Sequence, residues 1–443
     1  MNEAQLLELP QWDLAAEQLP RRSVLYAPAP AGMRTAMGGS LTSYLACLAA
    51  AHCVYPGVLL REMVLPMLEE AEAQGSEREL HPLWRRDGSL SHLVNVTGSR
   101  AQAALQVLET LTMRTDLSGL SLAALTEVLS LRGLTRNRLA WCPLCYKEWQ
   151  TNAQVLYDPL LWKFREISLC VCHGVRLQTT CPNCARSQPH LAWRSRPGYC
   201  TFCAWPLFGE QIERQKPIDP ETTAFIWQQW ITETLGTLVA RLPSIQDYPR
   251  RERIRLAVNH AVEGLADGNI AAFARILDLS RNTVENWCQG KRIPELDMLL
   301  RLCYRLNLPL SEVLLQEAEV LQPCLQDSIS ETCFQPRRRT AIDKEQIVHL
   351  LEEAAGGAEY PPPSLQEVSQ QLGYQPTTLY KINRVACHAI AERFTAYRRE
   401  LRDRRLQGYR EEIRRIALYL QAEQVALTQR HIARYLAAAS YFT

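Results

Sequence analysis

Eight cysteine and histidine residues in the middle of the chain have the spacing of metal ligands. They form four short motifs, each with two residues between its two ligands, so that both ligands can reach one ion from a tight turn. Two such turns complete a tetrahedron with no position left for water, as in structural zinc sites. We therefore predict two structural Zn²⁺ ions. The predicted ligand sets are Cys142, Cys145, Cys170 and His173, and Cys181, Cys184, Cys200 and Cys203.

Two details of this assignment stay open on the sequence alone. Cys172 adjoins His173 and is an alternative to Cys170, which we prefer because it repeats the two-residue spacing. The remaining cysteines have no partner at such a spacing, and we expect them to be small buried apolar residues. These are Cys47, Cys53, Cys288, Cys303, Cys324, Cys333 and Cys387.

Other chemistry with similar motifs fits less well. Redox Cys-Pro-x-Cys motifs lie at a helix start in a βαβ unit, whereas here four half-motifs cluster. A zinc deaminase needs His-x-Glu ahead of Pro-Cys-x-x-Cys, and no histidine of this chain is followed two residues later by glutamate. The dipeptide Gly290–Lys291 is followed by Arg292, so it is no phosphate-binding loop for ATP. We find no obvious carboxylate pair for two metals, and therefore expect no enzyme.

The charge of the chain is balanced overall but uneven along its length. The formal net charge is +2. Residues 132–203 carry ten Arg and Lys against three Asp and Glu, and residues 336–443 carry seventeen against twelve. This uneven distribution indicates that these two segments form positively charged surfaces, which can bind phosphate groups. No apolar stretch approaches the roughly 20 residues of a membrane helix, and the polar start does not look like a signal peptide. We expect a cytoplasmic protein without a membrane partner.

Periodicity and composition predict a mainly α, multidomain fold with small β elements around the metal sites. We expect Ser40 to cap a helix that begins at Leu41, and further helices near 58–74, 99–112 and 121–131. The predicted domains are an arm at 1–36, a helical domain at 37–131, a double zinc module at 132–209, a helical domain at 210–320, a linker at 321–341 and a basic helical region at 342–443.

Residues 269–303 have the pattern of a helix-turn-helix. Phe273 lies on the inner face of a first helix, Ser280 can cap a second, and Gly290 can end it. This stretch resembles the Cro/repressor class, in which the second helix enters the major groove. The alternative is a helical bundle with a solvated polar face. The predicted DNA contacts are Arg281, Asn282, Glu285, Asn286, Gln289, Lys291 and Arg292.

A second unit of the same kind is predicted at 364–384. Ser364 and Glu367 form a capping box, and a second helix begins near Pro376. Basic helices follow at 393–415, whose arginines can reach phosphate or form a solvated face. The predicted DNA contacts here are Gln375, Thr377, Thr378, Lys381, Arg384, Arg398 and Arg399.

The order of motifs through the first zinc set makes a family resemblance clear. The run from Arg138 to Cys145, then Tyr157-x3-Leu161-Trp162, Cys170-x2-His173-Gly174 and Cys181-Pro182-x-Cys184, resembles the TniQ/TnsD family of target selectors of Tn-seven-type transposons. The resemblance covers about residues 1–210. Family members usually have an acidic residue and an arginine where Gly39 and Cys47 stand in this chain.

The resemblance implies a protein that recognises a double-stranded DNA attachment site and recruits the AAA+ ATPase TnsC, and through it the transposase subunits. We assign the arm and the first helical domain to that recruitment, with Trp12 as an aromatic anchor. One alternative is an adaptor that joins an RNA-guided Cascade complex to TnsC without reading sequence. Another is a helix-turn-helix transcription repressor. The basic extension beyond residue 320 favours the direct reader.

Overall fold

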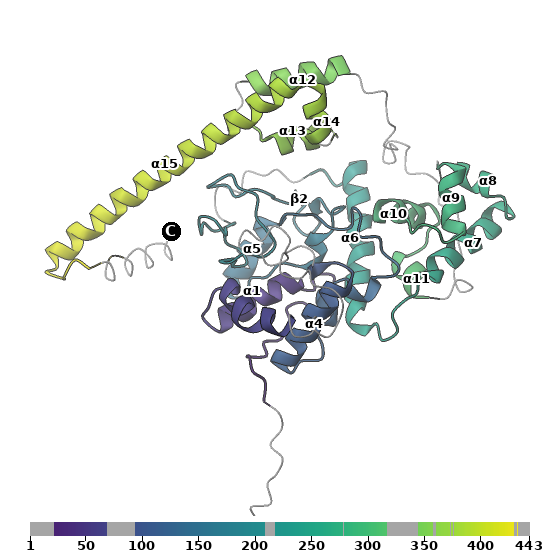
Figure 1. Cartoon of the computed structure of the whole chain (residues 1–443), viewed down its shortest axis with the longest axis horizontal. Helices are drawn as coiled ribbons and strands as arrows, with labels where there is room; N and C mark the ends of the chain where they lie inside the picture. The colour runs from purple at the N-terminus through teal and green to yellow at the C-terminus, as the bar shows by residue number, and fades with distance from the viewer. Residues whose placement is uncertain are drawn as a thin grey trace, which may run out of the picture.

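The computed structural model describes residues 22–68, 94–208, 218–277, 279–316, 344–357, 360–372, 374, 376–428 and 432. Within these ranges the protein is mostly helical, with few strands, as the sequence predicts (Figure 1). Trp12 and Gln375, both predicted contact residues, lie outside the described residues, as do Cys324 and Cys333.

The amino-terminal helices surround a core of their own. Helix α1 (Leu41–Ala51) is followed by α2 (Pro56–Leu59), which continues through a π turn (Leu60–Val64), and helix α4 (Ser99–Thr112) packs beside them. Leu41, Leu45 and Leu48 are fully buried on the inner side of α1. Every residue from Leu41 to Ala46 is buried, so the core encloses the first turns of this helix on all sides.

One expectation for this region is wrong, and another is met only in part. Residues 121–131 form a short 3₁₀ turn at Ala123–Leu125 and other turns instead of an α-helix. The backbone N–H of Leu122 donates to the carbonyl of Asn95 (3.1 Å), and that of Ala123 donates to the hydroxyl of Ser121 (3.2 Å), so hydrogen bonds other than those of an α-helix hold the chain here. Ser40 does occupy the N-cap position of α1, but its hydroxyl donates to the carbonyl of Asp158 (2.9 Å) instead of accepting from the helix.

Helix α6 (Thr223–Arg241) connects the zinc-type module to the helices that follow. Thr222 caps it by accepting a hydrogen bond from the backbone N–H of Phe225 (3.3 Å). Its buried side packs on the 3₁₀ turns at Leu160–Lys163 and Ser118–Leu120 and on α11 (Leu310–Leu315). Helices α7 (Glu252–Ala266), α8 (Ile270–Ile276), α9 (Arg281–Cys288) and α10 (Leu296–Arg305) complete this unit.

The carboxyl-terminal region is a separate helical unit. Helices α12 (Lys344–Gly356), α13 (Leu365–Leu372) and α14 (Pro376–Ile382) pack against the start of α15 (Arg384–Ala422) around a small core of their own. The region expected as several basic helices is this one helix of 39 residues. Figure 1 shows α15 running from α12–α14 at the top of the view to its far left.

Hydropathy along the described helices gives one further result. No single helix there is long and apolar enough to cross a membrane. The segments Leu41–Ala51 and Pro56–Leu68 reach the threshold only when they are counted together across a bend of 97°.

Candidate metal centres and nucleic-acid interface

The first ligand cluster is assembled from a helix start and a hairpin turn. Cys142 is the N-cap of α5 (Pro143–Thr151), so Cys145 lies in its first turn. Pro143 is therefore the first helical residue, where a missing N–H costs nothing. Cys170 and His173 come from the tight turn between β1 (Leu169–Cys170) and β2 (Val175–Arg176), which pair antiparallel.

The four ligand atoms lie at the distances of a tetrahedral zinc site. The Sγ atoms of Cys145 and Cys170 are 3.6 Å apart, and Nδ1 of His173 lies 3.4 to 3.6 Å from the three sulfur atoms. A tetrahedron with the usual Zn–S and Zn–N bond lengths has edges of about 3.75 Å between sulfurs and about 3.55 Å from sulfur to nitrogen. The cluster can therefore bind a metal ion, and its dimensions are compatible with zinc.

Glu148 is a residue of this site that the sequence reasoning missed. One turn of α5 beyond Cys145, its carboxylate lies 3.6 Å from Nε2 of His173. With a metal bound at Nδ1, Nε2 would carry the ring N–H and face an acceptor, the usual arrangement for a metal-bound imidazole. The spacing of three residues after Cys145 on a helix was the available signal, since residues three apart share a face.

The second cluster is built from two copies of one turn. In both, the residue after the second cysteine (Ala185 and Ala204) has a left-handed backbone, and its N–H donates to the carbonyl of the first cysteine (2.9 and 2.8 Å). This reversal aims both sulfurs of each turn at the same point. The Sγ atoms of Cys181 and Cys203 are 3.7 Å apart, and those of Cys184 and Cys200 are 3.6 Å apart. These distances again fit a tetrahedral zinc with four thiolates and exceed the roughly 2.05 Å of a disulfide.

Each cluster favours at least one thiolate. Hydrogen bonds from Cys145 and then Cys170 lower the pKa of Cys142 to about 4, although burial opposes this. In the second cluster, hydrogen bonds from Cys181 and Cys184 lower the pKa of Cys200 to about 7. Hydrogen bonds to neighbouring thiols, and then burial, raise the pKa of Cys145 and Cys181. Because thiolates are the form that binds metal, a metal ion would have to displace the protons of these two thiols.

The structure distinguishes the remaining cysteines. Cys170 is buried within the first cluster, whereas Cys172 is exposed. Cys303 and Cys387 are buried as expected, and Cys47 and Cys288 are partly buried. The expectation is wrong for Cys53, which is exposed because it lies in the turn after α1 with a positive φ of 55°.

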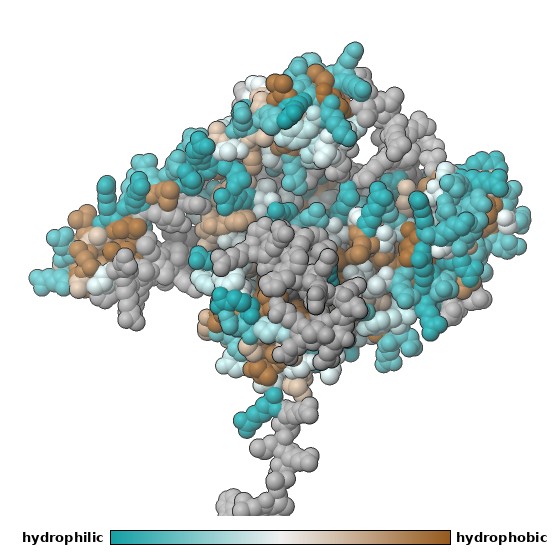
Figure 2. Space-filling model, in the orientation of Figure 1, coloured by the Kyte–Doolittle hydropathy of each residue, from teal (hydrophilic) through white to brown (hydrophobic). Residues whose placement is uncertain are grey.

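Helix α9 presents most of its predicted contact residues to solvent. The hydroxyl of Ser280 accepts a hydrogen bond from the backbone N–H of Thr283 (3.2 Å), while Val284 and Trp287 are buried beneath the helix. Gly290, with a φ of 67°, ends it. Arg281, Asn282, Gln289, Lys291 and Arg292 are exposed, and Glu285 and Asn286 are half-buried. The surface over α7–α9 is largely hydrophilic (Figure 2).

Two arginines, one at the N-cap of α7 and one in its first turn, adjoin this surface and were missed by the sequence reasoning. The guanidinium of Arg251 donates to the carbonyl of Lys291 (3.1 Å). The side chain of Arg255 lies over Gly290, where an added Cβ would come within 3.2 Å of it. The turn that follows α9 is therefore bordered by basic side chains from an earlier helix. Their separation of about 40 residues in sequence gave no signal.

The second unit has the predicted capping box. The backbone N–H of Ser364 donates to Oε2 of Glu367 (2.7 Å), and the N–H of Glu367 donates to Oγ of Ser364 (3.2 Å), which confirms that prediction. Thr377, Lys381 and Arg384 are exposed around α14, and Thr378 is half-buried. Figure 1 shows this unit apart from α7–α9. Arg398 and Arg399 lie further along α15, beside Arg186 of the second ligand cluster.

Comparison with known proteins identifies one domain. The family model described as TniQ matches residues 30–177, a segment that contains the whole first ligand cluster. No curated protein matches the chain. The domain suggests involvement in target selection for Tn-seven-type transposition. The chain thus contains a TniQ domain, and this is consistent with a protein of the TniQ/TnsD family.

Proposed function

We propose that this protein is a non-catalytic target selector of transposition, which reads a double-stranded DNA attachment site and recruits the AAA+ ATPase TnsC. In this proposal two structural Zn²⁺ ions hold the module between the recruiting and the reading parts. TniQ-family proteins are non-catalytic transposition adaptors, which fits this role. The reading parts are the units around α9 and α14.

The presentation of α9 is the observation that carries the DNA-binding proposal. Its first turn is capped by Ser280, its underside is buried through Val284 and Trp287, and Arg281 and Asn282 are exposed at its start. The first residues of a recognition helix are the ones that reach base edges in a major groove. Arginine pairs with guanine and asparagine with adenine through two hydrogen bonds each. Lys291 and Arg292 follow the helix at a place suited to backbone phosphate.

A footprint on DNA fragments that adjoin the element tests this proposal. We expect the metal-loaded protein to protect one asymmetric site of two to three helical turns, since each unit covers about one turn of ~10 base pairs. Arg281→Ala should weaken specific binding by about 1–3 kcal/mol. Arg241→Ala is the matched control, because Arg241 is exposed at the end of α6 and outside both units.

Other footprints would contradict direct reading. Binding that shows no discrete site and disappears as salt rises would indicate only phosphate contacts, and would favour the adaptor that depends on a Cascade complex. Protection of a palindrome by a dimer would favour a transcription repressor.

An exposed apolar patch near the start of the described chain supports the recruitment proposal. Val24, Tyr26, Val54 and Tyr55 are 65%, 63%, 38% and 53% exposed. The ring of Tyr26 stacks on His52 with centroids 4.3 Å apart, which ties the residues before α1 to the turn after it. Exposed aromatic side chains of this kind commonly anchor protein partners.

Binding of purified TnsC tests recruitment. Tyr26→Ala and Trp12→Ala should each weaken TnsC binding while leaving the DNA footprint unchanged, since both residues lie far in sequence from α9 and α14. Val155→Ala removes a side chain that is 66% exposed elsewhere and serves as the control. Unchanged TnsC affinity in both aromatic variants would contradict the assigned surface.

A further inference from the structure

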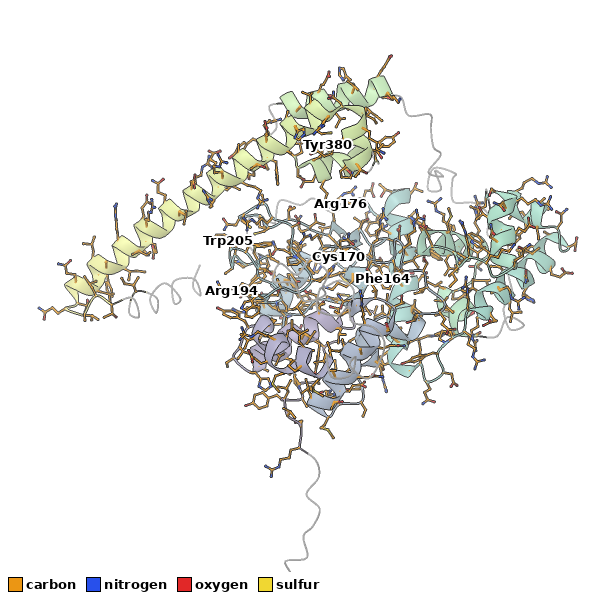
Figure 3. The ribbon with its side chains drawn as sticks, viewed as in Figure 1. Phe164, Cys170, Arg176, Arg194, Trp205 and Tyr380 are labelled. Atoms are coloured by element: carbon orange, nitrogen blue, oxygen red, sulfur yellow. The ribbon has the colours of Figure 1, made fainter. Side chains whose placement is uncertain are left out.

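A cleft lies where the second ligand cluster meets helix α15. One wall comes from the turns around that cluster and includes Asn183, Arg186 and Phe202, and the other comes from α15 and includes Arg398, Arg399 and Arg402. Its volume is about 300 Å³. Figure 3 shows Trp205, from the second turn of the cluster, on the side of the module near which α15 passes.

Within the described part of the chain, the side chains that line the cleft include four arginines and no acidic residue. The guanidinium of Arg186 lies over the ring of Phe202, 5.0 Å from its centre. Among the residues that the structure describes, no ion pair joins Arg186, Arg398 or Arg399 to a carboxylate. Arg402 is paired with its neighbour Asp403 (3.3 Å). Burial, and then the charge of Arg186, lowers the pKa of Arg398, so like charges from the two walls face each other.

A bound metal would account for part of this charge. A zinc ion with four thiolates would have a formal charge of −2, and Cys184 of that set lines the cleft. The occupied site would then offset two guanidinium groups, and Asp403 offsets a third. One positive charge would remain without a partner, which matches the single negative charge of one phosphodiester.

We propose that this cleft binds one phosphodiester of the DNA backbone, held jointly by Arg186 of the metal module and Arg399 of α15. The inference rests on the proposed DNA-binding function and adds a site to it. Guanidinium groups are well suited to phosphate because their planar N–H donors can bind two oxygens at once. A phosphate between the two walls connects the metal module to the carboxyl-terminal unit, so that bound DNA fixes their relative position.

The salt dependence of binding to a random-sequence duplex measures this contact. Each phosphate contact contributes about 0.9 to the slope of log affinity against log salt. We expect Arg399→Ala and Arg186→Ala each to reduce the slope by about 0.9. In the double variant the slope should also fall by about 0.9, and not by about 1.8, because both arginines are needed to hold the same phosphate. Arg414→Ala, an exposed arginine further along α15, should leave the slope unchanged.

Each other result overturns the inference in a distinguishable way. Additive losses in the double variant would indicate two separate phosphate contacts. If Arg414→Ala reduced the slope as much as Arg399→Ala does, the positive charge along α15 would attract DNA without a specific site. If the cleft variants kept the wild-type slope but released zinc faster, the arginines would serve to balance the charge of the metal site. If the duplex binds and Lys291→Ala reduces the slope while the cleft variants do not, only the cleft site fails. If the duplex does not bind at all, the proposed function fails with it.

Discussion

The contact between Glu148 and His173 predicts a selective effect on one metal site. The carboxylate lies 3.6 Å from Nε2 of the imidazole, where it favours the tautomer that leaves Nδ1 free to bind metal. Removing such a partner lowers metal affinity by about 10- to 100-fold. Because Glu148 is 59% exposed, we expect Glu148→Gln to lower the metal affinity of the first cluster by about 10-fold. Competition with a chelator measures the change.

The second cluster is an internal control for this variant. Among the described residues, no hydrogen bond or ion pair joins Glu148 to the second cluster, which should therefore release a bound ion at the wild-type rate. If both clusters of the variant released their metal faster than in the wild type, or if neither did, a specific role for Glu148 at the first cluster would be contradicted.

Asp158 and Lys163 form a buried pair beside the first cluster. Their side chains are 5% and 1% exposed, with Nζ of Lys163 3.3 Å from Oδ2 of Asp158, and the hydroxyl of Tyr146 donates to the other carboxylate oxygen. Asp158→Asn leaves the lysine charge buried and without a counterion, which costs about 3–5 kcal/mol. Denaturant unfolding measures this loss. Glu62→Gln is the control, because its pair with Arg61 is more than half exposed and is worth about 0–1 kcal/mol.

The same pair predicts a pH dependence. Burial lowers the pKa of Lys163, and the charge of Asp158 opposes that shift. Without Asp158 the lysine pKa falls further, so the folded variant binds fewer protons than the folded wild type between the two folded pKa values. Its stability relative to the wild type then rises with pH in that window. We expect a smaller deficit at mildly alkaline than at neutral pH. A constant deficit would show that charge burial is not its cause.

At the scale of elements, the cap of α13 predicts a local loss of stability. Oγ of Ser364 accepts the N–H of Glu367 (3.2 Å) at a point where the helix has no carbonyl to accept it. Ser364→Ala should therefore destabilise the carboxyl-terminal unit by about 1 kcal/mol. Hydrogen exchange of α13 and α14 measures the loss. Ser364→Thr keeps the hydroxyl acceptor and should therefore retain most of the stability. Equal losses of stability in the Ala and Thr variants would contradict a role for the cap.

Features with short-range causes could be predicted from the sequence. The capping box at Ser364 and the cap of the helix at Ser280 depend on neighbours three residues away. Each ligand motif depends on two ligands that are separated by two residues. The turns at 121–131 could not be predicted, because the backbone N–H of Leu122 donates to the carbonyl of Asn95, a residue distant in sequence. The cleft could not be predicted either, since Arg186 and Arg399 are more than 200 residues apart.

At the scale of the molecule, the metal module and the first helix-turn-helix share one core. The buried cluster that contains Cys142, Cys181 and Cys200 continues without interruption through α6 to Phe273 and Trp287. The carboxyl-terminal helices instead pack around Ile347, Leu351, Leu379 and Ile390 in a separate cluster. Loss of metal should therefore reach α9 through packed side chains but not α14.

Removal of zinc by a strong chelator tests this division in the full chain. We expect protection of the backbone amides of α8 to α10 to fall together with that of the ligand turns, because the buried cysteines are part of the core beneath them. Amides of α12 to α14 should keep their exchange rates, since no ligand side chain packs in their core. Hydrogen exchange read by mass spectrometry distinguishes the two regions within one sample. Readdition of zinc controls for direct effects of the chelator and should restore α8 to α10. Simultaneous loss of protection in α12 to α14 would show that the carboxyl-terminal unit depends on the metal module for its fold, and the two cores would then be one cooperative unit.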